Sequence, residues 1–475
     1  IDEGIIDTKE NHFVVTDKIK DVNIPETIND AILSRVDKLD EKTRELLNTA
    51  SVMGRNFYYK VLEEATDTIE ELDDRLSYLT EVQLISETKK KQEIEYLFKH
   101  ALSQQLTYEA MMQQSRKETH LKIARSIEKV FAANINEFYA TLVYHYEQAE
   151  DKEKTVYYML LAGEESRKSG ASSEALQFFE KALEAMPQAR KEDSKDHEIR
   201  DLRINIANML HAVGRNEEAV ELFEFIFEKY FNYRVAKTER GIILRGIWGM
   251  IIIAFAFRFQ YLFFKKPINK TKESICSHIL EWGTPITTIN PRHFVFKTSD
   301  AVRGFLRYDI MSSQAVLDIY IQIGAVFTWA SFSYPTVKKI IYLVDQADIK
   351  LKSRPLMSLN MAKSMFNANT GNWHHYPDFD EVFDKGMRIG ELWLVTIYAL
   401  HVGLQQIEKG NYAGTIKIAE RIKDLGNSFE NSHAIAQSYR LRVVYGMKFR
   451  KFEGLQELID KSTLYIQDTD HKTHL

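Results

Sequence analysis

The sequence has few residues that interrupt regular structure, with only 8 prolines and 20 glycines among its 475 residues. Together they make up about 6% of the chain, roughly half of the usual combined share. This scarcity argues against a collagen-like chain, low-complexity disorder and an all-β fold with many turns. The hydrophobic content of 44% is enough for a large core, and a chain of this length predicts about three domains.

Cysteine is almost absent, because Cys276 is the only one in the chain. A single thiol excludes a disulfide framework and a zinc site made of thiolates, and it fits a reducing compartment such as the cytoplasm. Apart from His278, no basic or histidine-rich frame surrounds Cys276, so we expect a small buried residue rather than a nucleophile. The chain starts at Ile1 without methionine and shows no signal peptide, so we expect a piece of a longer cytoplasmic protein.

An excess of positive charge is missing as well. The 63 lysines and arginines are outnumbered by 68 aspartates and glutamates, which leaves a formal net charge of −5. This balance gives no reason to expect nucleic acid or an anionic membrane as a partner.

Residues 25–130 are expected to form a winged-helix domain. Pro25 is typical of the first turn of a helix, because its missing N–H costs nothing there. Helical periodicity predicts three further helices, and two short apolar runs with a polar tip between them predict a β-hairpin. The predicted helices are 41–53, 58–65 and 69–82, and the predicted strands are 84–86 and 94–98.

The rest of the chain repeats a two-helix pattern. Gly163, Ala175, Phe179, Ala182 and Pro187 have the small–small–aromatic–small–proline spacing of a tetratricopeptide (TPR) unit. Each such unit buries only one face against its neighbours, so several must stack into an α-solenoid. We therefore predict an all-α fold in which the winged helix leads into a TPR-like solenoid. Further copies are expected at 200–230 and 396–427 and weaker helix pairs at 315–350, 356–390 and 432–462, which gives clear repeats over 131–233 and a divergent solenoid over 234–475.

Four stretches near the N-terminus resemble bacterial signal-transducing ATPases of the STAND class. The stretches are IPETINDAILSRVDKL at 24–39, RELLNTASVMGRNF at 44–57, LFKHAL at 97–102 and RKETH at 116–120. The pattern is most similar to multidomain proteins in which an adenylate/guanylate cyclase domain precedes the ATPase. The resemblance covers roughly residues 20–187. It implies that 1–24 is the end of the ATPase and lid region, that ATP or ADP binds upstream, and that a winged helix and a TPR solenoid follow.

No catalytic site is expected in this chain. No segment matches G-x-x-x-x-G-K-[ST], whose backbone N–H groups and lysine would cradle phosphates. No acidic pair on a strand pattern suits cyclase chemistry, and no Ser/His/Asp arrangement has a persuasive spacing. We therefore expect no cofactor and no metal in these residues, with ATP or ADP held by the upstream ATPase domain.

Two residues are candidates for sensing the nucleotide. His100 ends the second predicted strand, and the resemblance implies a winged-helix histidine placed against the β-phosphate, where an imidazole is a suitable donor. Arg35 lies on the preceding helix and is the second candidate. The alternatives are that His100 caps the following helix or hydrogen-bonds the hairpin, and that Arg35 is an ordinary exposed arginine.

The winged helix also raises a DNA-binding hypothesis. The helix in the recognition position carries five carboxylates against Arg75 alone, so a phosphate backbone would be repelled before base contacts could form. The carboxylates are those of Glu70, Glu71, Asp73, Asp74 and Glu81. Lys89 to Lys91 at the hairpin tip are interpreted as a solvated turn, so DNA is an unfavoured partner.

Two further segments leave alternatives open. Residues 246–264 are the most apolar stretch, for which a buried solenoid helix is favoured over a contact with a partner or membrane surface and over a true membrane span. Arg258 speaks against the span. The loop at 373–381 holds His374 and His375 with three carboxylates, but adjacent histidines point apart and Asp378 is typical of a helix N-cap. Metal binding there is not favoured.

The function expected from these patterns is that of a non-catalytic regulatory and protein-interaction module. It would couple a protein or small-molecule effector on the solenoid to an upstream, cyclase-linked ATPase. The alternatives are a DNA-binding transcription regulator and a membrane-proximal helical scaffold.

Overall fold

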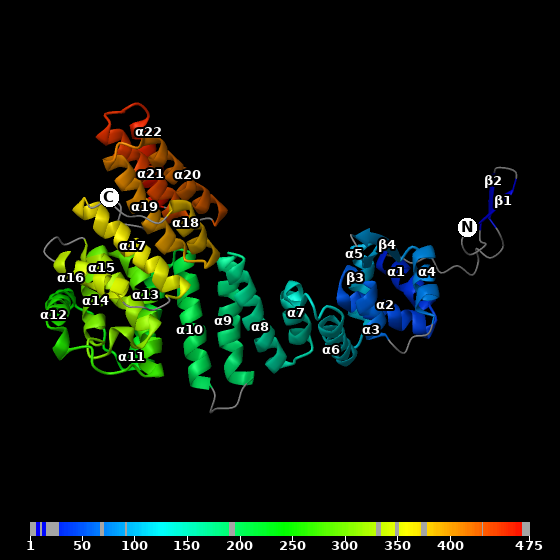
Figure 1. Cartoon of the computed structure of the whole chain (residues 1–475). Helices are drawn as coiled ribbons and strands as arrows, with labels where there is room; N and C mark the ends of the chain where they lie inside the picture. The colour runs from blue at the N-terminus through cyan, green and yellow to red at the C-terminus, as the bar shows by residue number, and fades with distance from the viewer. Residues whose placement is uncertain are drawn as a thin grey trace. The chain divides into compact units, whose positions relative to one another are not determined.

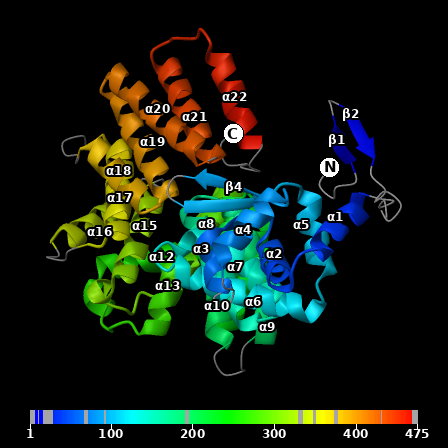
Figure 2. The ribbon, with the colours of Figure 1, turned by 90° about the vertical axis from the view of Figure 1, so that its right-hand side faces the viewer.

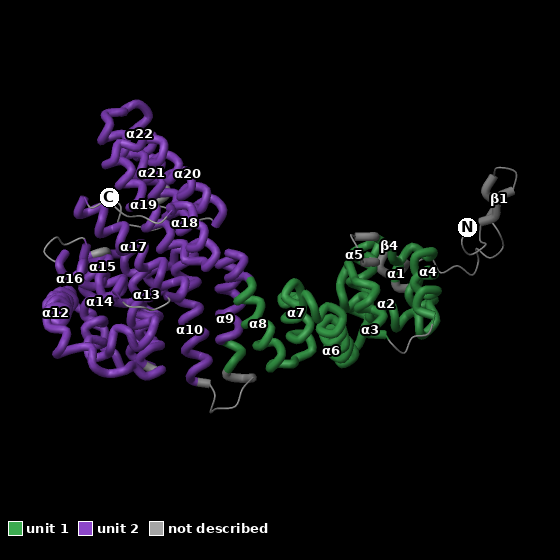
Figure 3. The backbone as a smooth tube through the Cα atoms, viewed as in Figure 1, with its two compact units in different colours: residues 1–165, 184–190 green, residues 166–183, 191–475 purple. Residues whose placement is uncertain are grey.

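The computed structural model describes residues 6–9, 12–15, 28–66, 71–90, 93–189, 195–328, 334–346, 351–371, 378–429 and 431–467. These residues contain 22 α-helices and five short strands (Figure 1), so the predicted helical class holds apart from the two small sheets. The chain divides into two compact units (Figure 3). Unit 1 contains residues 1–165 and 184–190, and unit 2 contains 166–183 and 191–475. The predicted domain boundaries at 24/25, 130/131 and 233/234 stay predictions.

Unit 1 begins with a hairpin, followed by four helices, and the strands of a second small sheet lie between and after the last three of these helices. The sheet has the antiparallel order β3-β5-β4, and the three helices α2 to α4 lie together beside its β4–β5 hairpin (Figure 2). The elements are β1 (Ile6–Lys9), β2 (His12–Val15), α1 (Ile28–Asp37), α2 (Glu41–Met53), β3 (Asn56–Tyr58), α3 (Tyr59–Ala65), α4 (Leu72–Glu81), β4 (Ile85–Lys90) and β5 (Glu93–Phe98).

The core of this part joins the helices to the sheet. Phe57 of β3 stacks on Tyr96 of β5 with ring centroids 5.8 Å apart, and Phe57 and Leu46 of α2 are buried in one cluster. Strand β3 is absent from the sequence-based prediction, because three residues are too few to show a period of two. The rest of unit 1 is helical, with α5 (Ala101–Ala110), α6 (Gln113–Val130), a 3₁₀ turn (Ile135–Phe138), α7 (Tyr139–Gln148) and most of α8 (Lys152–Lys168).

Unit 2 consists of successive helices, most of them in antiparallel pairs. The predicted pairs at 200–230, 315–350, 356–390, 396–427 and 432–462 each correspond to two helices of the structure. The elements are α9 (Ser172–Ala189, partly in unit 1), α10 (Lys195–Ala212), α11 (Asn216–Phe231), α12 (Glu239–Arg258), α13 (Lys270–Ile289), α14 (Pro291–Arg303), α15 (Gln314–Phe327), α16 (Tyr334–Gln346), α17 (Ser353–Thr370), α18 (Phe379–Arg388), α19 (Leu392–Glu408), α20 (Tyr412–Ser428), α21 (Ser432–Lys448) and α22 (Leu455–Gln467).

Glycines make the α19–α20 pair possible. Gly410 lies in the turn with φ of +73°, a backbone conformation that glycine adopts without steric cost. Gly403 is buried, and a Cβ added to it would lie 2.4 Å from Leu441 Cδ2 of α21. One glycine therefore permits the turn and the other permits close packing of the next helix pair.

The first helices of these pairs form a continuous layer. Helix α13 contacts α15, α15 contacts α17, α17 contacts α19, and α19 contacts α21. The second helices of the pairs pack against this layer, since α20 contacts both α19 and α21 and α22 contacts α21. Residues of α13 and of α21, about 150 positions apart in sequence, can therefore face one space within unit 2.

Helix α12 corrects the expectation for 246–264. It spans Glu239–Arg258, and it is the one helix among the described residues that is long and apolar enough to cross a membrane. Only 33% of its most apolar window is buried, so it is not the fully buried helix that the sequence favoured. Gly246 and Gly249 allow one face to pack tightly on α14, whereas Trp248 and Ile251 on another face are 55% and 54% exposed.

Candidate functional site

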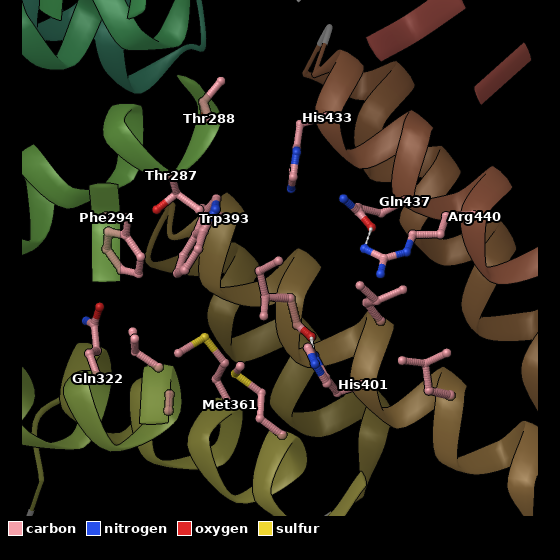
Figure 4. A pocket seen from close by; sticks show the side chains of 16 residues that line it. Thr287, Thr288, Phe294, Gln322, Met361, Trp393, His401, His433, Gln437 and Arg440 are labelled. Carbon is pink, nitrogen blue, oxygen red and sulfur yellow. Dashed lines mark hydrogen bonds between the residues drawn. The ribbon is translucent and has the colours of Figure 1, made fainter. Parts of the chain in front are cut away.

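A pocket of about 320 Å³ opens on the layer of first helices in unit 2 (Figure 4). Six helices supply its walls, namely α13, α14, α15, α17, α19 and α21. A volume of this size lies at the lower end of the range for sites that bind small molecules. The lining residues are Thr287, Thr288, Phe294, Gln322, Ala325, Val326, Met361, Met365, Trp393, Ile397, Leu400, His401, Leu404, His433, Gln437 and Arg440.

Most of the wall is apolar and adaptable. Phe294, Met361 and Trp393 reach the cavity from three different helices (Figure 4). Methionine side chains are unbranched and polarisable, so they adjust to ligands of different shape. The pocket therefore suits an apolar molecular body rather than one rigid outline.

The two histidines and the arginine of the lining lie on α19 and α21, whereas Thr287, Thr288 and Gln322 lie on α13 and α15. Arg440 donates from Nη1 to Gln437 Oε1 at 3.5 Å, as Figure 4 shows. His401 Nδ1 lies 2.8 Å from the Ile397 carbonyl oxygen, which can only accept, so Nδ1 carries the proton. Burial lowers the pKa of His401 to about 4, and this imidazole is therefore neutral at pH 7.

The charge on Arg440 is not balanced from within the described residues. The residue as a whole is exposed where it lines the pocket, and none of the described carboxylates forms an ion pair with its guanidinium. Burial of the guanidinium lowers the pKa of Arg440 from its usual value, which indicates that the positive form is less well solvated there than in open water. No aspartate or glutamate is among the lining residues that the structure describes.

A second recess of about 540 Å³ adjoins the first. The two share Thr288, Trp393 and His433. Its other walls include the turns at Gly170 and Gly214, which connect helices of the repeats. The pocket thus continues toward the turns of unit 2.

A half-buried charge cluster lies beside the pocket residue Gln322. The Arg354 guanidinium is 3.3 Å from a carboxylate oxygen of Glu391, 3.6 Å from Asp318 and 3.8 Å from Glu281. The pocket residue Gln322 donates to Asp318 at 3.4 Å and to Ser358 Oγ at 3.2 Å. This contact links the lining of the pocket to charges on α13, α15 and α17.

The three carboxylates differ in their surroundings. Burial raises the pKa values of Asp318 and Glu391 in spite of the neighbouring Arg354. Burial would also raise that of Glu281, but hydrogen bonds from His278 and Asn208 hold its pKa below the usual value. One guanidinium therefore faces three acidic groups in a poorly solvated space.

The structure places the two nucleotide-sensing candidates on the surface of unit 1. His100 is exposed immediately before α5, and its side chain makes no capping hydrogen bond to that helix. Arg35 is exposed in the last turn of α1, which contacts α5. Both stay predictions as sensing residues.

The only arginine of helix α4, Arg75, is hydrogen-bonded to residues of the same unit. Arg75 Nη1 donates to Asp40 Oδ1 at 2.8 Å and to Thr43 Oγ1 at 2.7 Å. The hydrogen bond from Thr43, together with Arg75, lowers the pKa of Asp40 to about 2. The side chains left on the exposed part of α4 are acidic at Asp73 and Asp74, so the described geometry offers a phosphate backbone no cation on this helix.

The remaining candidate segments have structural roles or lie outside the described residues. His374 and His375 are outside them, as is Lys91. Asp378 is an N-cap as predicted and accepts from the Glu381 N–H at 3.0 Å. Cys276 is fully buried, and burial raises the pKa of its thiol. Within the described ranges, no group of three or more histidine, cysteine or acidic side chains is arranged to hold a metal ion.

The pocket residues were not found from the sequence. Trp393, His401 and Arg440 lie in regions where the sequence shows only helical periodicity, and apolar lining residues have the same spacing as core residues. The one available signal is the third repeat copy at 396–427, which predicts the helix carrying His401 but not which face it turns to a cavity.

Comparisons with known proteins give little beyond this geometry. No protein-family model matches the chain, and no curated protein matches it. A solved structure that is similar to this chain is a Signal Transduction ATPase with Numerous Domains (STAND) protein with a tetratricopeptide repeat sensor from Pyrococcus horikoshii. The TM-score is 0.37 and the identity 13%, over 94% of this chain. The chain spans 54% of the length of that protein.

Proposed function

We propose that this chain is a non-catalytic regulatory module of a cytoplasmic signal-transducing ATPase of the STAND class. Unit 2 binds an effector in its pocket, and unit 1 passes the signal to an upstream, cyclase-linked ATPase domain that holds ATP or ADP. The chain itself needs no cofactor. The resemblance of residues 20–187 to such ATPases supports the upstream partner.

The same proposal assigns a winged helix to residues 25–130. The element order α2-β3-α3-α4-β4-β5 and the sheet order β3-β5-β4 support this assignment. The acidic exposed side chains of α4 and the engaged Arg75 favour a protein contact over a DNA contact. The wing is therefore proposed to pack on the nucleotide-binding domain.

The observation that carries the proposal is the pocket on the layer of first helices. Six helices meet there, so a ligand in the pocket contacts helices from several repeats at once. A ligand shifts a conformational equilibrium only by its difference in affinity for the two states. Because six helices line the pocket, a change in the spacing of these helices alters its shape, and the ligand then has different affinities for the two states.

The proposal is tested by His100→Ala in the full-length protein that contains this chain. If His100 contacts the β-phosphate, the loss of one charge-assisted hydrogen bond should speed ADP release at least about tenfold, since such bonds contribute about 1.5–3 kcal/mol. The measurement is the exchange of a fluorescent ADP for ATP. His197→Ala, at another exposed histidine, is the control and should leave the rate unchanged. Equal rates for all three proteins would remove the sensing role.

A second candidate function is attachment to an anionic membrane surface through α12. Five of its large apolar side chains are exposed on the part of unit 2 that the structure describes, and Tyr261 and Leu262 just after the helix are exposed as well. A recess of about 420 Å³ joins Trp248 and Leu262 to Lys265, Lys266 and Arg307. Apolar and aromatic side chains beside lysines and arginines are typical of helices that lie in a membrane interface. The five exposed residues of α12 are Leu244, Ile247, Trp248, Ile251 and Phe255.

Vesicle binding distinguishes this second function from the first. The chain should co-sediment with vesicles that contain phosphatidylserine and not with pure phosphatidylcholine. Trp248→Glu should weaken that binding more than about tenfold, because burial of a large apolar side chain contributes about 1.5–3 kcal/mol. Phe452→Glu is the control, as Phe452 is 65% exposed elsewhere in unit 2. If the chain stays in the supernatant with both kinds of vesicle, membrane attachment is excluded.

A further inference from the structure

We infer that the pocket of unit 2 binds a small amphipathic monocarboxylate, with its carboxylate on Arg440 and its apolar body among Phe294, Met361 and Trp393. This inference rests on the proposed function, because it names the chemical class of the effector.

The charge balance of the pocket selects an anion. Among the described lining residues, Arg440 supplies the only permanent charge and none is a carboxylate. His401 adds no charge at neutral pH, because burial of its imidazole disfavours the protonated form. The hydrogen bond from Arg440 to Gln437 Oε1 is long, at 3.5 Å, and it leaves the remaining guanidinium N–H groups to a ligand.

The number of charges favours a carboxylate over a phosphate. A planar guanidinium binds a carboxylate through two parallel N–H···O bonds, and the two single charges cancel. A phosphate monoester would bring a second negative charge into a recess whose described lining offers no second permanent cation. That excess charge would be poorly solvated.

The rest of the ligand faces mostly apolar side chains. Phe294, Met361 and Met365 are almost fully buried where they meet the cavity, and Trp393 adds an aromatic wall. Polar groups placed against these side chains would lose their hydrogen bonds to water without replacement. A carboxylate that carries a short alkyl chain or an aryl group can place its charge on Arg440 and its apolar part against Phe294, Met361 and Trp393.

The test compares three probes with the same apolar body and different head groups. Binding of octanoate, 1-octanol and octylamine to the whole chain is measured by isothermal titration calorimetry. Octanoate is expected to bind at least tenfold more tightly than octylamine. Arg440→Gln should weaken octanoate at least tenfold and leave 1-octanol within twofold. Arg442→Gln is the matched control, because Arg442 is on the same helix and pairs with Glu420 rather than lining the pocket.

The possible outcomes separate this inference from the proposed function. If octylamine binds as tightly as octanoate, or if Arg440→Gln leaves octanoate binding unchanged, the inference is wrong. If none of the probes binds, it is wrong as well. Neither result affects the His100→Ala experiment, which reports on unit 1 and the upstream domain without any ligand in unit 2. Tryptophan fluorescence of each variant verifies that unit 2 is folded, since all five tryptophans lie in unit 2.

Discussion

Acidification from pH 7 to pH 5 is expected to lower the free energy of unfolding of unit 1 by about 4 kcal/mol. The reason is a buried histidine pair. His120 Nδ1 of α6 and His145 Nδ1 of α7 are 2.9 Å apart, and Tyr108 Oη lies 3.2 Å from His120 Nε2. Both imidazoles are 1% exposed. One Nδ1 must donate and the other accept, so the contact requires that the pair carry a single Nδ1 proton.

The direction of the pH effect follows from the two pKa values. Burial, with Arg116 nearby, lowers the pKa of His120 to about 4, and burial next to His120 lowers that of His145 to about 3. In the unfolded chain both titrate near 6.5. The unfolded state therefore binds more protons between about pH 6.5 and pH 4, and stability falls as the pH falls through that window. Each histidine contributes about 2 kcal/mol by pH 5.

Urea unfolding at pH 7 and pH 5 measures this loss. Far-UV circular dichroism follows both units, and tryptophan fluorescence follows unit 2 alone. The double variant His120→Gln/His145→Asn should lose less than half as much stability on acidification as the unaltered chain. If the unit 1 transition of the unaltered chain has the same midpoint at both pH values, the pair is not held neutral.

Arg354→Met is expected to destabilise unit 2 by about 2–3 kcal/mol at pH 7.5. Methionine keeps much of the side-chain volume but removes the cation that faces Glu281, Asp318 and Glu391. Breaking a fully buried ion pair costs about 3–5 kcal/mol. Because Arg354 is 35% exposed, water replaces part of the lost interaction, so a smaller value is expected.

The midpoint of urea unfolding, followed by tryptophan fluorescence, measures the effect on unit 2. Lys417→Met is the matched control, since its pair with Asp380 is on the surface and should contribute less than about 1 kcal/mol. The loss in Arg354→Met should be smaller at pH 5.5, because Asp318 and Glu391 have raised pKa values and take up protons first. A loss no larger than that of Lys417→Met would show that the cluster is not held by Arg354.

The sequence predicts helices well where their ends carry local signals. The predicted helix 41–53 coincides with α2, because Asp40 accepts from the Thr43 N–H at its start and Gly54 ends it. Helix α12 (Glu239–Arg258) begins and ends several residues before the apolar stretch at 246–264 begins and ends. Its start depends on Thr238, which accepts from the Gly241 N–H, whereas the prediction followed apolar composition alone.

The candidate site depends on contacts between distant parts of the chain, which periodicity does not contain. In the sequence, Arg440 has the spacing of an ordinary polar residue on α21. Its candidate role as an anion-binding group depends on the described lining residues of five other helices, none of which is a carboxylate. Likewise, the sequence shows His120 only as part of the motif at 116–120, and nothing in the sequence predicts that His145 lies beside it. Recurrent glycines predict that helices pair, but not which side chains line the space between them.

The central claim is that the pocket of unit 2 and the upstream nucleotide site are coupled. The most direct test is the rate of ADP release from the full-length protein, with octanoate at a concentration that saturates the pocket and without it. Coupling between two sites typically changes affinity by about 5–150-fold, so we expect release to change at least fivefold in the unaltered protein and not in Arg440→Gln. An unchanged rate with octanoate bound would contradict the account.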